Sequence, residues 1–262
     1  MSSSASSFTG SSSDCTTGTP VSSDSPIREN IAAAVRRVRE TTPLAQSFTN
    51  FVTINLVANA QLAAGGTAAM SFLPDDVIET AKIAGANYIN VGTLLPFYKD
   101  SLPEIAQRLN YLGKPWVLDP VAAGIGRTRT SILQAFKAAP PTVIRANASE
   151  VIALANMWGL NTESAGDASE HRPAGVESVD DVDSATGAAV ALARYLTEQH
   201  AKHSSHDASI PCAVAVSGIA DLVTDGETVY RLSGGSSMMT KIIGAGCSLG
   251  GGQNCKSNGH EG

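Results

Sequence analysis

Polar and glycine residues stand directly after the predicted strands of this chain, where they could do chemistry together. The stretches are VLDPVAAGIG with Asp119, VIRANASE with Arg145, Asn147 and Glu150, VAVSGIAD with Ser217, and the glycine turn TKIIGAGC with Gly244, Ala245 and Gly246. Carboxylates can bind Mg²⁺, while a guanidinium and backbone N–H groups can hold the oxygens of a transferring phosphoryl group. Because the sequence lacks GxxxxGK[ST], this chemistry would not be that of a P-loop enzyme.

The elements that must position these residues alternate between helix and strand. The apolar spacing predicts helices at 26–40, 51–66, 74–85, 97–113, 128–139, 148–159 and 184–200. It predicts strands at 68–72, 87–92, 115–120, 142–147 and 212–218, then a hairpin at 221–232 that turns at Asp225-Gly226. The acidic stretch 160–184, with Gly and Pro but no periodicity, is predicted to be a long surface loop. Such alternation predicts an α/β fold, a three-layer α/β/α arrangement around a mostly parallel sheet, with the active edge at the strand carboxyl ends.

Composition narrows the class of protein. With 262 residues, 43% of them hydrophobic, the chain can bury one substantial core, and we expect one domain over residues 27–249. A net charge of -6 argues against nucleic-acid binding, and no stretch approaches the roughly 20 apolar residues of a membrane span. The four cysteines show no metal-ligand spacing, so we predict reduced thiols and a cytoplasmic location. Residues 1–26, rich in Ser and Thr, are predicted to be disordered, and residues 250–262 to form an irregular tail.

Eight segments in order resemble one known family. The run "NFVTINLVAN…GGTAAMSF…AKIAGANYINVGTL…VLDPVAAG…IRANASE…AGVES…VSGIADLV…TKIIGAGC" is similar to the hydroxyethylthiazole kinases, thiamine-salvage enzymes of the ribokinase-like superfamily. The resemblance covers roughly residues 27 to 249. It implies ATP-dependent phosphorylation of the hydroxyl of 4-methyl-5-(2-hydroxyethyl)thiazole, with Mg²⁺ as cofactor, and a homotrimer with active sites between subunits.

The resemblance also implies roles for particular residues. Met70, Asn50, Asn55 and Gly244 would bind the thiazole substrate; Arg145, Ser217 and Asn147 would bind ATP; Gly244, Ala245 and Gly246 would form the anion hole; Asp119 and Glu150 would hold Mg²⁺. Cys247 occupies the place where other ribokinase-like enzymes carry an aspartate base, so it would be the catalytic base. Its position at a helix N-terminus predicts a lowered thiol pKa.

Each of these residues also has a purely structural interpretation. Glu150 fits the Asx-x-x-Glu pattern of a helix capping box, a role compatible with metal binding. Asp119 could cap a turn, Ser217 could mark an ordinary strand end, and Met70 and Cys247 could be core residues.

The sequence departs from the family pattern in three places. Ala122 replaces a usual glycine, a mild change unless the backbone there needs a positive φ, and Ile243 replaces a usual threonine beside the phosphates. Family members continue past GAGC for several dozen residues, whereas SLGGGQNCKSNGHEG closes this sequence. We therefore expect the last helix to stop after about one turn, with the family's final helices lacking and the sheet surface that they would cover exposed as an apolar patch. Two alternatives stay open: another ribokinase-like alcohol kinase, or a non-catalytic remnant that binds ligand or partner subunits without turnover.

Overall fold

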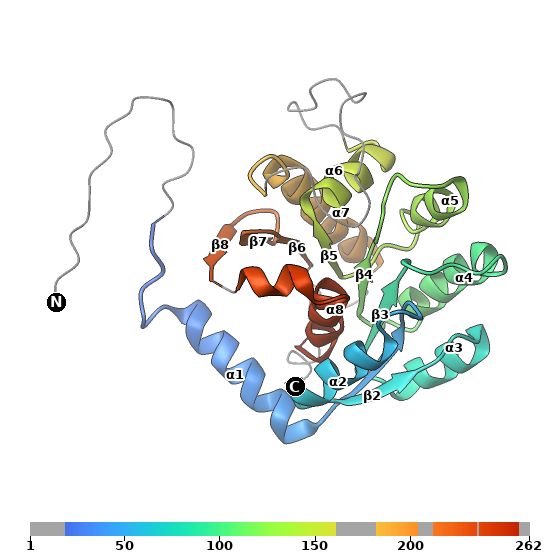
Figure 1. Ribbon diagram of the computed structural model, residues 1–262, viewed down its shortest axis with the longest axis horizontal. Helices are drawn as coiled ribbons and strands as arrows, with labels where there is room; N and C mark the ends of the chain where they lie inside the picture. Colours follow the sequence, from blue (N-terminus) through green and yellow to red (C-terminus); the bar gives the residue numbers. More distant parts are fainter. Residues whose placement is uncertain (1–18, 161–181, 204–211, 235, 257–262) are drawn as a thin grey trace.

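The computed structural model describes residues 19–160, 182–203, 212–234 and 236–256, arranged around one eight-stranded sheet (Figure 1). The predictions for residues 1–18, for most of the loop at 160–184 and for residues 257–262 lie outside the described residues. The strands are β1 (Leu44–Phe48), β2 (Thr67–Met70), β3 (Ala86–Asn90), β4 (Trp116–Asp119), β5 (Val143–Asn147), β6 (Ala213–Ser217), β7 (Ala220–Thr224) and β8 (Val229–Ser233). Their order is β2-β1-β3-β4-β5-β6-β7-β8, with β1 to β6 parallel and β7 and β8 antiparallel.

Helices alternate with the strands as the sequence predicts. They are α1 (Pro26–Thr41), α2 (Ile54–Ala64), α3 (Pro74–Ile83), α4 (Tyr98–Tyr111), α5 (Arg127–Ala135), α6 (Ala148–Met157), α7 (Thr186–His203), the 3-10 helix η1 (Ser237–Lys241) and α8 (Ala245–Lys256). The mostly parallel α/β fold is therefore confirmed. Strand β1 was missed, because its buried Gln46 and Ser47 interrupt the apolar run that marks an inner strand. Among the described residues, no helix combines the length and the apolar character that crossing a membrane requires.

The two faces of the sheet carry different kinds of core. Helices α3 to α7 cover one face and enclose the large apolar core, which includes Phe48, Trp116 and Leu192 (Figure 1). Helices α1, α2 and α8 cover the other face, where Val57 of α2 packs against Tyr88 and Val117. This second face holds the polar residues that follow the strands, so α8 covers the site as well as forming part of the fold.

Helix α8 contradicts the expectation that the last helix stops after one turn. It runs for 12 residues, from Ala245 to Lys256, through the glycines that the sequence analysis took as helix breakers. A Cβ on Gly250 would lie 2.8 Å from the ring of Tyr88, and one on Gly251 would lie 2.7 Å from Val57. These glycines let α8 approach the sheet and α2 closely, and this packing offsets their poor helix propensity.

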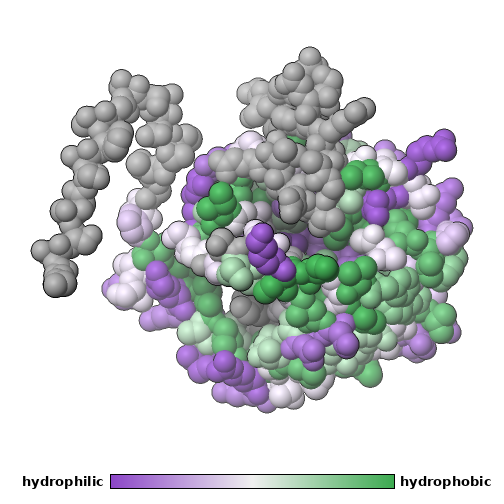
Figure 2. Space-filling model, viewed as in Figure 1, coloured by the Kyte–Doolittle hydropathy of each residue, from purple (hydrophilic) through white to green (hydrophobic). Residues whose placement is uncertain are grey.

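Apolar side chains are exposed beside α8. They come from the segment that leads into the helix and from the helix itself, and they are Met238, Met239, Ile242, Ile243 and Leu249. Figure 2 shows hydrophobic atoms bordering a hollow on this face. These side chains belong to the end of the chain and not to the sheet, whose residues Tyr88 and Val117 are buried on this face, so they do not bear out the expected exposure of the sheet surface.

The turn after β4 contains a strained residue. Ala122 has φ of 59°, in the left-handed region that an L-residue with a Cβ enters at a cost of about 1–2 kcal/mol. Its backbone N–H donates to Oε1 of Glu150 at 2.9 Å, which holds the turn in place. The position does need a positive φ, so the replacement of the family's usual glycine by Ala122 is not mild.

We predict that Gly250→Ala lowers the free energy of unfolding by about 1–3 kcal/mol, because the new methyl group overpacks the buried Tyr88 ring. Gly252→Ala is the matched control in the same helix, since a Cβ added at Gly252 would meet no described atom within 4 Å. It should raise the free energy of unfolding by up to about 1 kcal/mol through helix propensity alone. Urea denaturation followed by circular dichroism measures both. Equal effects of the two substitutions would contradict close packing of α8 on the sheet.

We also predict that Ala122→Gly stabilises the protein by roughly 0.5–1 kcal/mol, because relief of the strained φ exceeds the entropy gained by the unfolded chain. Ala123→Gly, one residue along, removes a fully buried methyl group from the core and should destabilise. Thermal denaturation of the two variants provides the comparison. A destabilising Ala122→Gly would mean that this turn is not strained.

Candidate functional site

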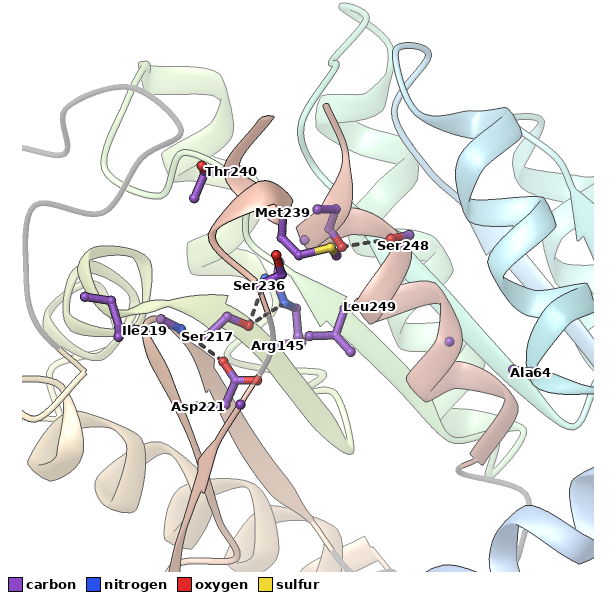
Figure 3. A pocket seen from close by; sticks show the side chains of 15 residues that line it. Ala64, Arg145, Ser217, Ile219, Asp221, Ser236, Met239, Thr240, Ser248 and Leu249 are labelled. Atoms are coloured by element: carbon purple, nitrogen blue, oxygen red, sulfur yellow. Dashed lines mark hydrogen bonds between the residues drawn. The ribbon is translucent and has the colours of Figure 1, made fainter. Parts of the chain in front are cut away.

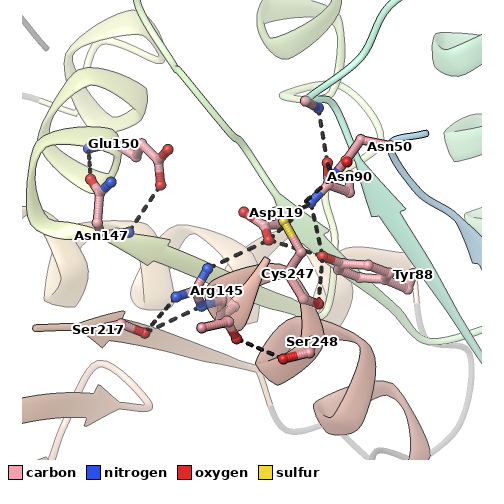
Figure 4. A network of polar contacts seen from close by, with 12 residues as sticks. Asn50, Tyr88, Asn90, Asp119, Arg145, Asn147, Glu150, Ser217, Cys247 and Ser248 are labelled. Atoms are coloured by element: carbon pink, nitrogen blue, oxygen red, sulfur yellow. Dashed lines mark hydrogen bonds and ion pairs between the residues drawn. The ribbon is translucent and has the colours of Figure 1, made fainter. Parts of the chain in front are cut away.

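The parallel strands bring the predicted site residues to one edge of the sheet. Asp119 ends β4, Arg145 lies in β5, and Ser217 ends β6, all on the face that α8 covers (Figure 4). Cys247 reaches the same place from the first turn of α8. Four segments distant in the sequence therefore meet where the α/β pattern predicts the active edge.

A buried ion pair forms the centre of the site. Oδ2 of Asp119 lies 3.5 Å from Nη1 of Arg145, and Asp119 is fully buried. The same oxygen accepts hydrogen bonds from the Tyr88 hydroxyl at 2.9 Å and from Nδ2 of Asn90 at 3.1 Å. Burial raises the pKa of Asp119, although Arg145 and these hydrogen bonds oppose the rise. Its other oxygen, Oδ1, is buried and has no hydrogen-bond partner among the described residues, which is unusual for a carboxylate oxygen.

Arg145 is held in a fixed orientation between this carboxylate and the neighbouring strand. Its Nε and Nη2 donate to Oγ of Ser217 at 3.2 and 2.9 Å. Burial lowers its pKa, but the carboxylate of Asp119 and other nearby groups more than compensate, so the net pKa of Arg145 is raised and the side chain stays charged. A Cβ on Gly246 would lie 2.6 Å from its Nη1, so the guanidinium lies directly against the first turn of α8.

Asn147 and Glu150 form the capping box of α6. The side chain of Asn147 accepts from the Glu150 backbone N–H at 2.9 Å, and Oε2 of Glu150 accepts from the Asn147 backbone N–H at 3.0 Å. Oε1 accepts from Ala122, so each carboxylate oxygen of Glu150 already receives one backbone N–H. Burial and then Asp119 raise the pKa of Glu150 to about 7. The structural interpretation of Glu150 as a cap is confirmed.

Cys247 lies between two side-chain amides. Nδ2 of Asn50 and Nδ2 of Asn90 each lie 3.3 Å from its Sγ, and its carbonyl oxygen lies 3.1 Å from the Tyr88 hydroxyl. Burial, followed by the charge of Asp119, raises the thiol pKa. The prediction of a lowered pKa at a helix N-terminus was therefore wrong, because desolvation and a nearby carboxylate outweigh the helix dipole and the amides.

The glycine turn enters α8 through a residue in the left-handed backbone region. Gly244 has φ of 85°, and a Cβ there would lie 2.4 Å from the Thr53 methyl carbon, so only glycine fits. Helix α8 begins at the next residue, Ala245, and the N–H groups of a helix's first turn have no partner within the helix. That turn lies against the Arg145 guanidinium, beside the ion pair, and the Ala245 N–H within it donates to the Ile242 carbonyl at 3.3 Å. Ile243, which precedes this turn, is 77% exposed.

The predicted thiazole-binding residues do not all gather at Cys247. Met70 packs beside Tyr88 and Val117, the cluster that Cys247 also contacts. Asn50 reaches the sulfur itself. Asn55 is exposed on α2, about 200° around the helix from the buried Val57, and so faces away from the sheet.

A cavity of about 930 Å³ opens beside Arg145 and Ser217. Figure 3 shows that Asp221, Met239 and Leu249 line it as well. Oδ1 of Asp221 accepts the Gly218 backbone N–H at 3.1 Å, which fixes the turn after β6. Such a volume suits a ligand the size of a drug molecule or cofactor. Among the described residues, no group of three or more His, Cys, Asp or Glu is placed to hold a metal ion.

Sequence reasoning missed Tyr88 and Asn90, which connect Asp119 to Cys247. Both belong to the stretch NYIN, and residues two apart in a strand share a face of the sheet. Two polar residues at that spacing, in a strand expected to be buried, signalled a polar patch on one face.

Comparison with known proteins agrees with this geometry. A model of the hydroxyethylthiazole kinase family matches residues 35–256. A hydroxyethylthiazole kinase of Bifidobacterium longum (strain NCC 2705) is 92% identical over 96% of this chain and 80% of its own length. One of Rhizobium johnstonii is 39% identical over 85% of this chain and 73% of its own length.

Solved structures give the same result. The structure of a hydroxyethylthiazole kinase protein from Pyrococcus horikoshii OT3 superposes with a TM-score of 0.68 at 27% identity, covering 88% of this chain and 81% of that one. An ADP complex of Bacillus subtilis pyridoxal kinase, with a TM-score of 0.56 at 14% identity over 84% of this chain and 86% of that one, shares the fold. The family match and the identities establish that this chain belongs to the hydroxyethylthiazole kinase family.

Proposed function

We propose that this protein transfers the γ-phosphoryl group of ATP to the hydroxyl of 4-methyl-5-(2-hydroxyethyl)thiazole, a step of thiamine biosynthesis and salvage. One observation carries the proposal: a buried carboxylate, a fixed guanidinium and a thiol meet at the first turn of α8. A carboxylate for a metal ion, a cation for phosphate oxygens and a base for the alcohol suit phosphoryl transfer, and the chain is 92% identical to a hydroxyethylthiazole kinase.

In this proposal Cys247 is the general base. Its thiolate takes the proton of the substrate alcohol while the alcohol oxygen attacks the γ-phosphorus, and the bond from phosphorus to the ADP oxygen breaks. The N–H groups of Gly244, Ala245 and Gly246 receive the charge of the transferring group. Arg145 and Ser217 contact the nucleotide from the cavity that they line, with Asn147 at the edge of the same strand end.

Mg²⁺ is the proposed cofactor, and the donor atoms fit it unequally. Oδ1 of Asp119 is buried and without a described partner, which suits a hard cation that takes one carboxylate and completes its shell with water and phosphate oxygens. Glu150 receives a backbone N–H on each oxygen, so its contact to the ion would pass through water. When bound, the ion would neutralise charge that develops on the phosphate oxygens.

Substrate binding and assembly extend this proposal. Gly244 and Met70 would line the thiazole pocket, with Asn50 behind the sulfur. Asn55, exposed on α2, could contact substrate only at a site completed by another subunit, as in the proposed homotrimer. Cytoplasmic location likewise stays a prediction.

These observations argue against the two alternative functions. The non-catalytic remnant rested on the absence of the family's final helices and on a last helix of about one turn; the second of these grounds fails, because α8 continues to Lys256. If the substrate were another alcohol, such as a pyrimidine, this chain would differ in its substrate from a hydroxyethylthiazole kinase to which it is 92% identical. Neither alternative has a specific observation in its favour.

We predict that the purified chain converts the thiazole alcohol and Mg-ATP to the thiazole phosphate, measured by mass spectrometry. Cys247→Ala should lower kcat by roughly 100-fold or more without abolishing thiazole binding, because general-base catalysis contributes about that much. As the pKa of the Cys247 thiol is raised, the thiolate fraction and hence kcat should rise with pH above neutrality. This rise should be lost in Cys247→Ala.

Cys212→Ala is the control, since the Cys212 thiol is buried in the large apolar core, away from the site. Size-exclusion chromatography of the same samples separates a folded trimer from an aggregate. No product from a folded trimer, or equal kcat in the wild type and Cys247→Ala, would overturn the proposed function or its base.

A further inference from the structure

Two asparagine amides converge on the sulfur of Cys247 from different strands. Asn50 follows β1 and Asn90 ends β3, yet both place Nδ2 at 3.3 Å from Sγ (Figure 4). Both side chains are buried, with Asn50 5% and Asn90 0% exposed. Burying two amides costs free energy unless they are fully hydrogen-bonded. Nδ2 of Asn50 is shared between the sulfur and Oδ1 of Asn90, and Nδ2 of Asn90 is shared among the sulfur, the Tyr88 hydroxyl at 2.9 Å and Oδ2 of Asp119 at 3.1 Å, so the sulfur is one acceptor that both amides have in common.

The orientation of each amide is fixed by the groups around its oxygen. Oδ1 of Asn50 accepts the backbone N–H groups of Val52 and Thr53, both at 3.1 Å. Oδ1 of Asn90 accepts the Gly92 backbone N–H at 2.9 Å and Nδ2 of Asn50 at 3.1 Å. A flipped amide would place its NH₂ group against N–H donors, so the NH₂ group must face the sulfur in both residues.

Amide donors around the sulfur favour its deprotonated form, which is the better hydrogen-bond acceptor. A thiolate accepts hydrogen bonds strongly and a neutral thiol only weakly, and hydrogen bonds to a charged partner are about twice as strong as neutral ones. The two amides therefore oppose Asp119, whose negative charge acts on the same sulfur. The Thr53 side chain acts on the sulfur in the same sense as the two amides.

We propose that Asn50 and Asn90 are a pair of positioning residues, which hold the Cys247 sulfur in place and stabilise it as the anion that accepts the substrate proton. This inference rests on the proposed role of Cys247 as general base. It also changes the role of Asn50, because both hydrogens and the oxygen of its amide are engaged by protein groups. Asn50 acts on the substrate through the sulfur rather than by direct contact.

The sharpest variant is Asn50→Asp. It has the same shape and keeps the acceptor for Val52 and Thr53, while an oxygen replaces the NH₂ group at the sulfur. We expect kcat to fall about tenfold or more with KM for the thiazole within twofold, because the change affects the sulfur and leaves the pocket walls intact. Alkylation of Cys247 by iodoacetamide at pH 8, quantified on the Cys247 peptide, should slow by a similar factor.

Asn110→Asp is the matched control. Nδ2 of Asn110 donates to the Pro140 carbonyl at 3.0 Å, and its Oδ1 accepts from the Trp116 indole. The substitution therefore makes the same chemical change in a hydrogen-bonded amide that lies away from the sulfur. It should alter neither kcat nor the alkylation rate. If Asn50→Asp does not fold, Asn50→Ser replaces it in the experiment, because this change removes the amide and keeps a hydroxyl acceptor near Thr53. We expect the same fall in kcat and in the alkylation rate.

Unchanged kcat and alkylation in a folded Asn50 variant would overturn the inference. Unchanged alkylation alone would do so too, because it reports on the sulfur without turnover. If Cys247→Ala keeps full kcat while Asn50→Asp slows alkylation, the positioning stands and the proposed base fails. The two ideas can therefore fail separately.

Discussion

The buried ion pair between Asp119 and Arg145 is the constraint on which the rest of the site depends. Two charges removed from water on adjacent strands are tolerated only if their remaining hydrogen-bonding capacity is used. Tyr88 and Asn90 supply donors to the carboxylate, and Ser217 supplies an acceptor to the guanidinium. This requirement explains why Tyr88, Asn90 and Ser217 gather around the ion pair on the face of the sheet that α8 covers.

Helix α8 must fit over this charged centre. Gly246 leaves room for the guanidinium, and Gly250 leaves room for the ring of Tyr88, which itself bonds to Asp119. The helix brings Cys247 to the site at the same time. The same residues pack α8 against the sheet and complete the site, so the site is complete only when α8 is packed.

Much of the fold could be predicted from the sequence, since helices and parallel strands in alternation leave periodic apolar patterns. The gathering of Asp119, Arg145 and Ser217 at one edge followed from that topology alone. What failed depends on contacts between distant segments. Local propensity could not reveal that Gly250 packs against Tyr88, or that burial beside Asp119 raises the pKa of Cys247. Strand β1 was missed because two of its buried residues are polar.

The backbone turn at Ala122 shows how local strain and the site are connected. Its N–H is bonded to Glu150, and Glu150 also caps α6, so one carboxylate fixes both the turn after β4 and the helix after β5. Asp119 precedes that turn and Arg145 precedes that helix. The Glu150 carboxylate thus fixes the backbone segments that follow Asp119 and Arg145.

A double-mutant cycle on Asp119 and Arg145 tests the central claim most directly. The free energy of unfolding would be measured by urea denaturation for Asp119→Asn, for Arg145→Met and for the double variant. We predict that each single change costs about 3 kcal/mol, because it leaves one buried charge without its partner. The double variant should cost less than the sum of the two by at least about 1 kcal/mol. Additive losses would show that the two charges do not depend on each other, and would contradict this account of the site.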